Sequence, residues 1–137
     1  MPASQPTANQ FRSFRDDPYD GPIAQVNLLK FRVRAEYRDA DHDDGAGEAG
    51  SVAYGRYVDA FRVAAAEVGG VCLLFSEVER YLIGNGDWDA VLVMQFPSRA
   101  AFIATLNHAD YHDMHRHRDA GLLCQELLTT RVAESAK

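Results

Sequence analysis

Hydrophobic and polar positions divide the chain into short apolar segments and longer amphipathic ones. The apolar segments are rich in Val, Leu, Ile and Phe, which is typical of β-strands, and they cover residues 25–33, 71–83, 90–96 and 122–132. Residues 51–68 place apolar side chains at intervals of three and four, which predicts a helix that ends before a Gly-Gly pair. A second helical region is expected from the cap residue Ser98 to Gly121, with a break near Asn107.

The order of these elements predicts the fold class. Strand–helix–strand–strand–helix–strand is the order of the ferredoxin-like α+β fold, a four-stranded antiparallel sheet with helices on one face. The strand at 90–96 is apolar at nearly every position, which indicates that both of its faces are covered. Two helices can cover only one face, so we expect a second copy of the chain to cover the other. The expected domain spans residues 25–132, with a polar N-terminal arm at 1–24 and a tail at 133–137.

Composition narrows the class of protein and the class of partner. A chain of 137 residues has room for one domain with a buried core. The formal net charge of −6 argues against nucleic acid or an anionic membrane as a partner. The first 22 residues contain no apolar run, so we expect neither a signal peptide nor a membrane span. Cys72 and Cys124 lie far apart in apolar segments and are expected to be buried free thiols in the cytoplasm.

Several stretches of the sequence resemble a known family. They are VNLLKFR in the first strand, AYGRY in the first helix, the GG that follows it, WDAVLVMQFPS around the third strand, and ADYH and HRDAGL near the end. Together they resemble the uncharacterised family called domain of unknown function 1330, over roughly residues 25–132. The most specific part is FPS followed by a helix that carries a tyrosine and an arginine.

The resemblance implies a fold and an assembly but leaves the reaction open. The family belongs to the dimeric α+β barrel superfamily, whose members join two ferredoxin-like sheets into a barrel with a ligand cavity. These members include cofactor-free monooxygenases, isomerases, polyketide cyclases, haem enzymes and small-ligand sensors. The N-terminal arm and the acidic loop at 34–50 depart from the shorter family members, and either could cover the mouth of the cavity.

Four of the five histidines lie between residues 107 and 121. At about 100° per residue, one stripe of a helix carries His108, His112, His115 and Asp119, beside the apolar face rather than on it. A histidine pair four residues apart is a known metal geometry, but no HExxH glutamate or third well-held ligand accompanies it. We therefore interpret the stripe as a largely solvated face, with a metal site or a ligand-contacting histidine as alternatives.

No metal or other cofactor is expected elsewhere in the chain. The acidic run that begins at Asp39 fails the calcium-loop pattern, because its sixth position is Asp44 and its twelfth is Gly50. The sequence has no phosphate loop, dinucleotide fingerprint, G-x-S-x-G or CxxC motif. These absences disfavour the commonest cofactor enzymes.

Arg118 is the strongest candidate for a ligand-binding residue. On the same helical spacing it lies between Tyr111 and Met114, on the face that packs inward. A buried guanidinium needs a partner, because leaving its charge unpaired is costly. The partner is either an anionic ligand or a structural carboxylate, for which the sequence offers Glu77, Glu79, Asp89 and Glu126. Tyr111 and Arg118 also match the family pattern, and we add the neighbouring His117 as a candidate for proton transfer.

Polar residues within or next to the strands supply further candidates. Asn27 and Lys30 interrupt the first strand and Gln95 interrupts the third, as a cavity for a polar ligand would require. The structural alternative is that Lys30 extends to solvent and Gln95 bonds locally. Trp88 and Asp89 lie at the turn before the third strand; Trp88 is a candidate ligand contact, and Asp89 is a candidate base or a turn cap. Tyr57, on the first helix, is a further candidate ligand contact.

These observations predict a small-molecule-binding protein without a bound cofactor. The first hypothesis is a cofactor-independent enzyme acting on a small organic acid by proton transfer, isomerisation, cyclisation or oxygenation. Arg118 would hold the anion, and His117 or Asp89 would move a proton. The alternative is a non-catalytic ligand-binding or sensor module that uses the same cavity. A metal or haem protein is the least favoured of the three.

Overall fold

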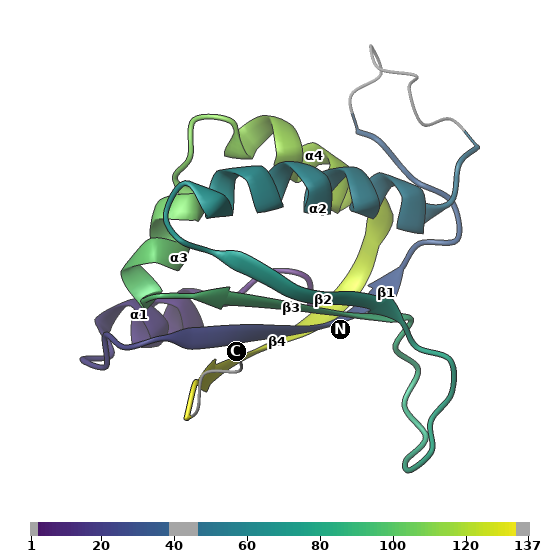
Figure 1. The fold of residues 1–137 in the computed structure, drawn as a ribbon. Coiled ribbons are helices and arrows are strands. Elements are labelled where there is room, and N and C mark those ends of the chain that lie inside the picture. Colours follow the sequence, from purple (N-terminus) through teal and green to yellow (C-terminus); the bar gives the residue numbers. More distant parts are fainter. Residues whose placement is uncertain (1–2, 39–46, 134–137) are drawn as a thin grey trace.

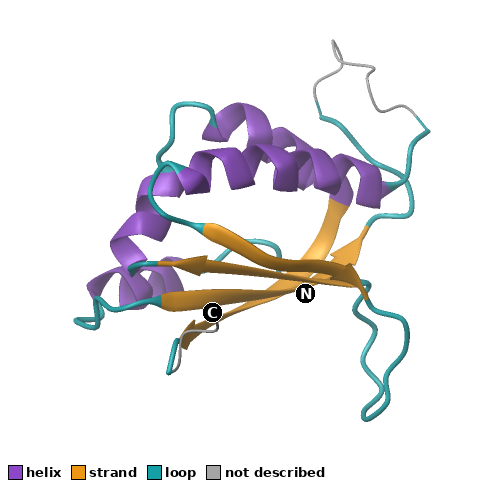
Figure 2. Ribbon diagram, viewed as in Figure 1, coloured by secondary structure: helices purple, strands orange, loops and turns teal. Residues whose placement is uncertain are grey.

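The computed structural model describes residues 3–38 and 47–133 and consists of one sheet and its helices. In chain order the elements are α1 (Ala8–Asp16), β1 (Ile23–Phe31), α2 (Gly50–Ala66), β2 (Val71–Glu77), β3 (Ala90–Phe96), α3 (Arg99–Leu106), α4 (Tyr111–Gly121) and β4 (Leu122–Arg131). The sheet is antiparallel, with strand order β2-β3-β1-β4, and α2 and α4 lie together on one of its faces (Figures 1 and 2). The expected strand–helix–strand–strand–helix–strand order is therefore present, with α3 and α4 forming the second helical region.

The second strand is shorter than the sequence predicts. It pairs with β3 only as far as Glu77, opposite Ala90, with a bulge between Cys72 and Leu74. The predicted strand continued to residue 83, but residues 78–89 form a loop that projects from the sheet on the side away from the helices (Figure 1). Apolar residues there are exposed, so hydrophobicity alone was a poor guide to the end of this strand.

The N-terminal arm contains a helix that the sequence analysis did not predict. Thr7 and Gln10 form a capping box at the start of α1, in which each side chain bonds to the backbone N–H of the other residue. At its other end, Arg99 donates to the carbonyl oxygens of Phe14 at 2.6 Å and Tyr19 at 2.7 Å. The buried side chain of Arg99 thus fastens α1 to α3.

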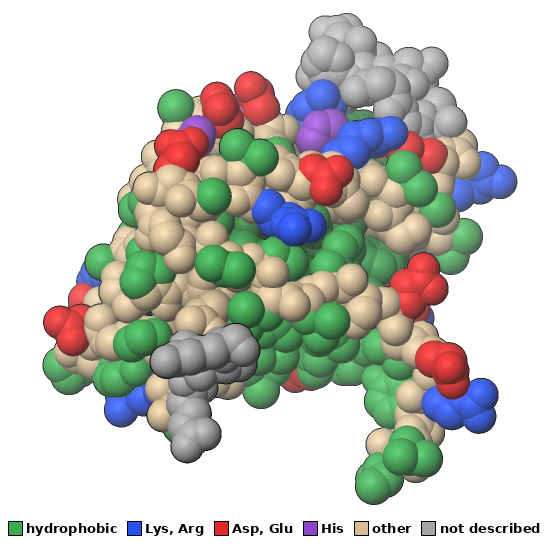
Figure 3. Space-filling view, in the orientation of Figure 1, with side chains coloured by type: hydrophobic (Ala, Val, Ile, Leu, Met, Phe, Trp, Pro, Cys, Tyr) green, Lys and Arg blue, Asp and Glu red, His purple; other side chains and the backbone are tan. Residues whose placement is uncertain are grey.

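The two faces of the sheet differ in what covers them. The side chains of β1 and β3 alternate between buried and half-buried positions, and the buried ones face α2 and α4. The opposite face, which we call the outer face, carries Val26, Leu28, Val91 and Val93, with Leu74 opposite Val93 and Leu128 opposite Val26. No element of the described residues covers it, and Figure 3 shows hydrophobic side chains across the strands below the helical layer.

Two glycines bring the ends of α2 and α4 into close contact. A Cβ atom on Gly121 would lie 2.2 Å from the carbonyl oxygen of Gly50, closer than any side chain permits. The backbone of Arg32 bonds to both residues, accepting from the Gly50 N–H at 3.1 Å and donating to the Gly121 carbonyl at 2.8 Å. This contact fixes the C-terminal turn of α4, and Arg118 with it, against α2 and the end of β1.

Three smaller predictions concern the undescribed residues, the two cysteines and membrane-spanning helices. Residues 39–46, which include most of the acidic run that fails the calcium-loop pattern, and the last four residues of the tail lie outside the described residues. Cys72 and Cys124 are free thiols, half-buried rather than buried. Across the described ranges, no helix is long and apolar enough to cross a membrane.

Candidate functional site

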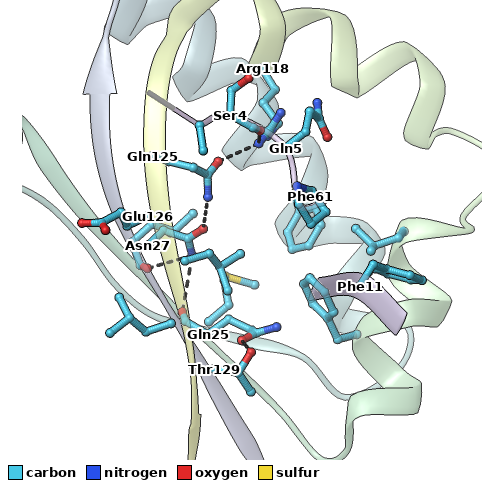
Figure 4. A pocket seen from close by; sticks show the side chains of 18 of the residues that line it. Ser4, Gln5, Phe11, Gln25, Asn27, Phe61, Arg118, Gln125, Glu126 and Thr129 are labelled. Atoms are coloured by element: carbon cyan, nitrogen blue, oxygen red, sulfur yellow. Dashed lines mark hydrogen bonds between the residues drawn. The ribbon is translucent and has the colours of Figure 1, made fainter. Parts of the chain in front are cut away.

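A cavity of about 670 Å³ lies between the inner face of the sheet and the helices (Figure 4). Its apolar wall is mainly aromatic, with Tyr54, Tyr57 and Phe61 from α2, Tyr111 from α4, and Phe11 and Phe14 from α1. Its polar wall includes Gln25, Asn27, Gln125, Thr129, His115 and Arg118, and Gln10 and Glu126 also line the cavity. Residues 3–6, which we call the N-terminal strap, border the cavity beside Arg118 and His115. The volume and the mixed lining are typical of small-molecule sites.

A chain of hydrogen bonds runs across the polar wall from α4 to β3. Arg118 Nη2 donates to Gln125 Oε1 at 2.7 Å, and Gln125 Nε2 donates to Asn27 Oδ1 at 3.1 Å. Asn27 Nδ2 then donates to the carbonyl oxygen of Leu92 at 3.1 Å (Figure 4). Because both ends of each amide are engaged, the chain fixes the orientation of Gln125 and holds the guanidinium at the cavity wall.

Arg118 is buried without a full set of hydrogen bonds. The residue is only 8% exposed, and its Nη2 also donates to the carbonyl oxygen of Ser4 in the strap. Its Nη1 is buried and, among the described residues, has no hydrogen-bond partner, although Asp119 Oδ1 lies 3.7 Å away. None of the four structural carboxylates suggested by the sequence pairs with Arg118 in the described part of the chain. Nη1 is therefore in an ion pair with Asp119 but makes no hydrogen bond among the described residues.

His115 is the histidine of α4 that lines the cavity. Its Nδ1 lies 3.3 Å from Asp119 Oδ2, one helical turn along, and its Nε2 lies 3.4 Å from the amide nitrogen of Gln5. Burial lowers the pKa of the His115 imidazole; Arg118 and His112 lower it further, and Asp119 opposes them. The ring is therefore neutral near pH 7. Because a carboxylate faces Nδ1, the proton belongs on Nδ1 and the lone pair on Nε2.

The aromatic residues of α2 serve as a wall rather than as acids or bases. Burial raises the pKa of the Tyr57 phenol well above its ordinary value, and it also raises the pKa of Tyr54. Both phenols therefore stay protonated at neutral pH. The ring of Tyr57 lies 5.5 Å from that of Phe61 and 6.4 Å from that of Tyr111, so these rings form one aromatic surface.

The structure brings some of the sequence-predicted site residues together and separates the others. The cavity is lined by Arg118, Tyr111, Asn27 and Tyr57. The residues that lie outside it are His117, Asp89, Lys30, Trp88 and Gln95. Arg118 does lie on the inward face of its helix, as its position in the sequence predicts.

The residues outside the cavity have identifiable contacts. His117 Nδ1 lies 2.6 Å from the hydroxyl oxygen of Tyr37, away from the cavity. Asp89 accepts from the Phe31 N–H at 2.9 Å and from Lys30 Nζ at 3.2 Å, so it closes the end of β1 as a turn cap.

Two further candidates also lie away from the cavity. The backbone N–H of Trp88 donates to the Tyr81 hydroxyl at 2.9 Å. Gln95 pairs with Ala24 and Val71 and points to the outer face.

Three members of the predicted histidine stripe, His108, His112 and His115, line one open surface pocket beside α4. His108 precedes α4, in the turn after α3, where its Nε2 lies 3.0 Å from Glu67 Oε2. His115 is partly exposed, as the sequence predicts, and it also borders the cavity, which fits the ligand-contacting alternative left open for this stripe. The residues that the structure describes include no group of three or more His, Cys, Asp or Glu side chains placed to hold a metal ion.

Sequence reasoning missed several residues of the polar wall. Gln25 lies two positions before Asn27, so strand alternation predicts that both face the same side as the buried Ile23 and Leu29. Gln125 and the strap gave no comparable signal, because their positions depend on pairing across the sheet and on the path of the N-terminal arm.

Comparison with known proteins identifies relatives of unknown function. The family model described as "Domain of unknown function (DUF1330)" matches residues 50–130. RPA0582, a protein of unknown function from Rhodopseudomonas palustris, has a solved structure that is similar with a TM-score of 0.84 and 28% identity, over 98% of this chain and 100% of that chain. No curated protein matches the sequence.

A more distant structure supports the fold alone. A dimeric protein of unknown function with a ferredoxin-like fold from Bacteroides fragilis NCTC 9343 matches with a TM-score of 0.50 and 16% identity, over 83% of this chain and 100% of that chain. Together with the observed topology, it confirms the ferredoxin-like α+β fold that the sequence predicts.

Proposed function

The chain belongs to the family described as a domain of unknown function (DUF1330), and from that premise we propose that it binds a small organic acid in the cavity beneath α2 and α4. The family supplies no ligand, so the proposal depends on the geometry of the cavity. The observation that carries it is the buried Arg118 Nη1, which has no hydrogen-bond partner among the described residues.

A carboxylate satisfies Arg118 better than the strap does. Buried polar groups without partners are costly, and a guanidinium edge matches the two oxygens of a carboxylate. The Ser4 carbonyl supplies one neutral acceptor to Nη2 and none to Nη1. An incoming carboxylate would take the place of Ser4 and engage both nitrogens. The aromatic surface of Tyr57, Phe61 and Tyr111 would then hold an apolar body.

We also propose that the protein works as a cytoplasmic homodimer whose subunits meet through their outer faces. The support is an uncovered apolar face on which Leu74 and Leu128 are 47% and 49% exposed. Leu82 and Ile83, at 90% and 89% exposure, lie in the loop that projects on the same side of the sheet (Figure 1). Free thiols at Cys72 and Cys124 fit a reducing compartment.

The binding proposal is tested with a carboxylate and its neutral isostere. Hydrocinnamate and hydrocinnamamide differ only in the charged group, and each is added to the protein during urea denaturation. Hydrocinnamate should raise the free energy of unfolding by RT ln(1 + [L]/Kd), which reaches about 2.7 kcal/mol at a hundredfold excess over Kd. The amide should give a smaller increase at the same concentration.

Two variants test whether Arg118 binds the carboxylate of the ligand. Arg118→Met leaves Ser4 and Gln125 without their donor, so it should lower the stability by about 1–3 kcal/mol and abolish the response to hydrocinnamate. The control is Arg62→Met, which removes an exposed arginine of α2 and should keep the full response. The proposal would be refuted if hydrocinnamate did not raise the free energy of unfolding of the wild-type protein, or if it still raised that of Arg118→Met.

A further inference from the structure

Resting on the proposed binding of an organic acid at Arg118, we propose that His115 and Asp119 are a general-base pair that enolises aryl α-keto acids in the cavity. His115 borders the same cavity as Arg118, and the two residues are three positions apart on α4. Residues at that spacing share one face of a helix, so the base and the anion anchor face the same ligand.

The geometry of His115 suits a base. Its Nδ1 faces Asp119 Oδ2 at 3.3 Å, and this carboxylate fixes both the tautomer and the orientation of the ring. Its Nε2 is turned toward the strap, where the amide nitrogen of Gln5 lies 3.4 Å away. Gln5 is therefore the group that a ligand must move to reach Nε2, just as Ser4 is the group that it must move to reach Arg118.

The electrostatics support the same role. The charged or titratable groups that act on His115 are Asp119, Arg118 and His112, all on α4, while the strap contributes the uncharged Gln5. Because burial keeps the imidazole neutral near pH 7, it has a lone pair available for a proton. The nearby positive charge of Arg118 stabilises negative charge that develops on a bound substrate.

The lining of the cavity points to an aryl α-keto acid as the substrate class. The carboxylate requires Arg118, and an aryl group fits the aromatic surface formed by Tyr57, Phe61 and Tyr111. A ketone beside the carboxylate makes the neighbouring methylene acidic enough for an imidazole base. The reaction needs no oxidant, reductant or cofactor.

The proposed step is a proton transfer that balances within the substrate. His115 Nε2 takes a proton from the methylene carbon, and the electron pair of that C–H bond forms a carbon–carbon double bond. The π pair of the ketone moves to its oxygen, which develops negative charge beside Arg118. The same proton then returns from the imidazolium to that oxygen and gives the enol.

The test follows phenylpyruvate in heavy water by proton NMR, which reports exchange of the methylene protons. The wild-type protein should exchange them faster than buffer that contains the same concentration of free imidazole. His115→Gln should lower kcat at least about a hundredfold, while phenylpyruvate still stabilises the protein against urea. The control, His108→Asn, removes a histidine that contacts Glu67 outside the cavity and should retain the wild-type rate.

Asp119 is a positioning residue with its own readout. Its carboxylate raises the pKa of His115 against the effect of burial. Asp119→Asn should therefore move the acid limb of the kcat/KM profile to lower pH as well as lower kcat, which a loss of folding alone would not do. Asp119→Glu should recover part of the rate and of the pH position.

The outcomes separate the two proposals. Binding of hydrocinnamate and phenylpyruvate without exchange above the imidazole control overturns the catalytic inference and leaves the binding proposal standing. Exchange that persists in His115→Gln also overturns the inference. If neither acid stabilises the wild-type protein, the binding proposal fails, and the inference that rests on it fails as well.

Discussion

Gly121 approaches Gly50 so closely that a Cβ atom on Gly121 would lie 2.2 Å from the Gly50 carbonyl oxygen and 2.7 Å from the Tyr54 amide nitrogen. Both contacts are with backbone, which cannot rotate away as a long side chain can. Side chains at this crossing are therefore excluded by the packing of α2 against the end of α4, and not by the backbone conformation of the glycines.

Gly121→Ala should be strongly destabilising, because α4 or α2 must shift to make room. The loss should be at least about 1–3 kcal/mol in urea denaturation. Gly55 provides the matched control: it lies within α2, and a Cβ there meets nothing within 4 Å. Gly55→Ala should instead stabilise the protein by about 0.5–1 kcal/mol, because alanine is the better helix former. Equal effects of the two variants would contradict this account of the crossing.

The stability of the protein should depend on pH through His115. Its folded-state pKa is lowered from 6.5, chiefly by burial, so well above that pH the ring is neutral in both states and contributes no slope. As the pH falls below 6.5, the unfolded chain takes up a proton more readily, and the free energy of unfolding decreases until the folded pKa is passed.

Denaturation of wild type and His115→Asn between pH 5 and 8 isolates this contribution. As the pH falls through 6.5 the wild-type protein should lose more stability than the variant, and well above 6.5 the two curves should run parallel. His108→Asn tests whether any histidine near α4 has the same effect. Parallel curves for wild type and His115→Asn over the whole range would show that His115 is not desolvated in the folded state.

The N-terminal strap should slow the entry of ligands. Ser4 and Gln5 contact Arg118 and His115, so both contacts must break before a carboxylate reaches the polar wall. Removing residues 1–6 should raise the association rate constant of hydrocinnamate roughly five- to a hundredfold, as expected for the loss of two hydrogen bonds of about 0.5–1.5 kcal/mol each. Stopped-flow tyrosine fluorescence would measure it. An unchanged rate constant would mean that ligands enter by another route.

Self-association should depend on the outer face. Leu74 is 47% exposed on that face, so Leu74→Glu should leave the isolated chain folded and convert a dimer into a monomer in light scattering. Val63, which is 69% exposed on α2, provides the control, and Val63→Glu should remain a dimer. A wild-type protein that is monomeric at micromolar concentration would refute the dimer.

The order of elements could be predicted because local signals agree with the final packing. β3 matches its predicted bounds, and Ser98 caps α3 through the Ala101 N–H, as its position predicts. Both signals are local, one a run of apolar residues and the other a hydroxyl before a helix. The predicted end of β2 was wrong because residues 78–83, which are mostly apolar, do not pair with β3, and pairing is not a local property.

The residues of the candidate site could be predicted only where helix or strand periodicity determines which side chains point toward the core. Arg118 lies in the cavity wall, as helix periodicity predicts. Asn27, Lys30 and Gln95 were predicted only as polar interruptions of strands, and of these three only Asn27 lines the cavity. Helix periodicity predicts the partly solvated position of His115, but it does not predict its contact with the cavity, which depends on the strap and α1. Asp89 was considered both as a base and as a turn cap, and only its contacts with Phe31 and Lys30 distinguish the two.

The backbone of the strap has a consequence for the colloidal behaviour of the protein. β4 is an edge strand, and the N–H of Gln125 on that edge donates to the carbonyl oxygen of Ala3 at 2.8 Å. Unpaired peptide groups on a sheet edge are templates for a strand from another molecule. The N-terminal strap lies outside every helix and strand, yet it occupies part of that edge. It therefore protects the protein against aggregation through the addition of a strand from another molecule.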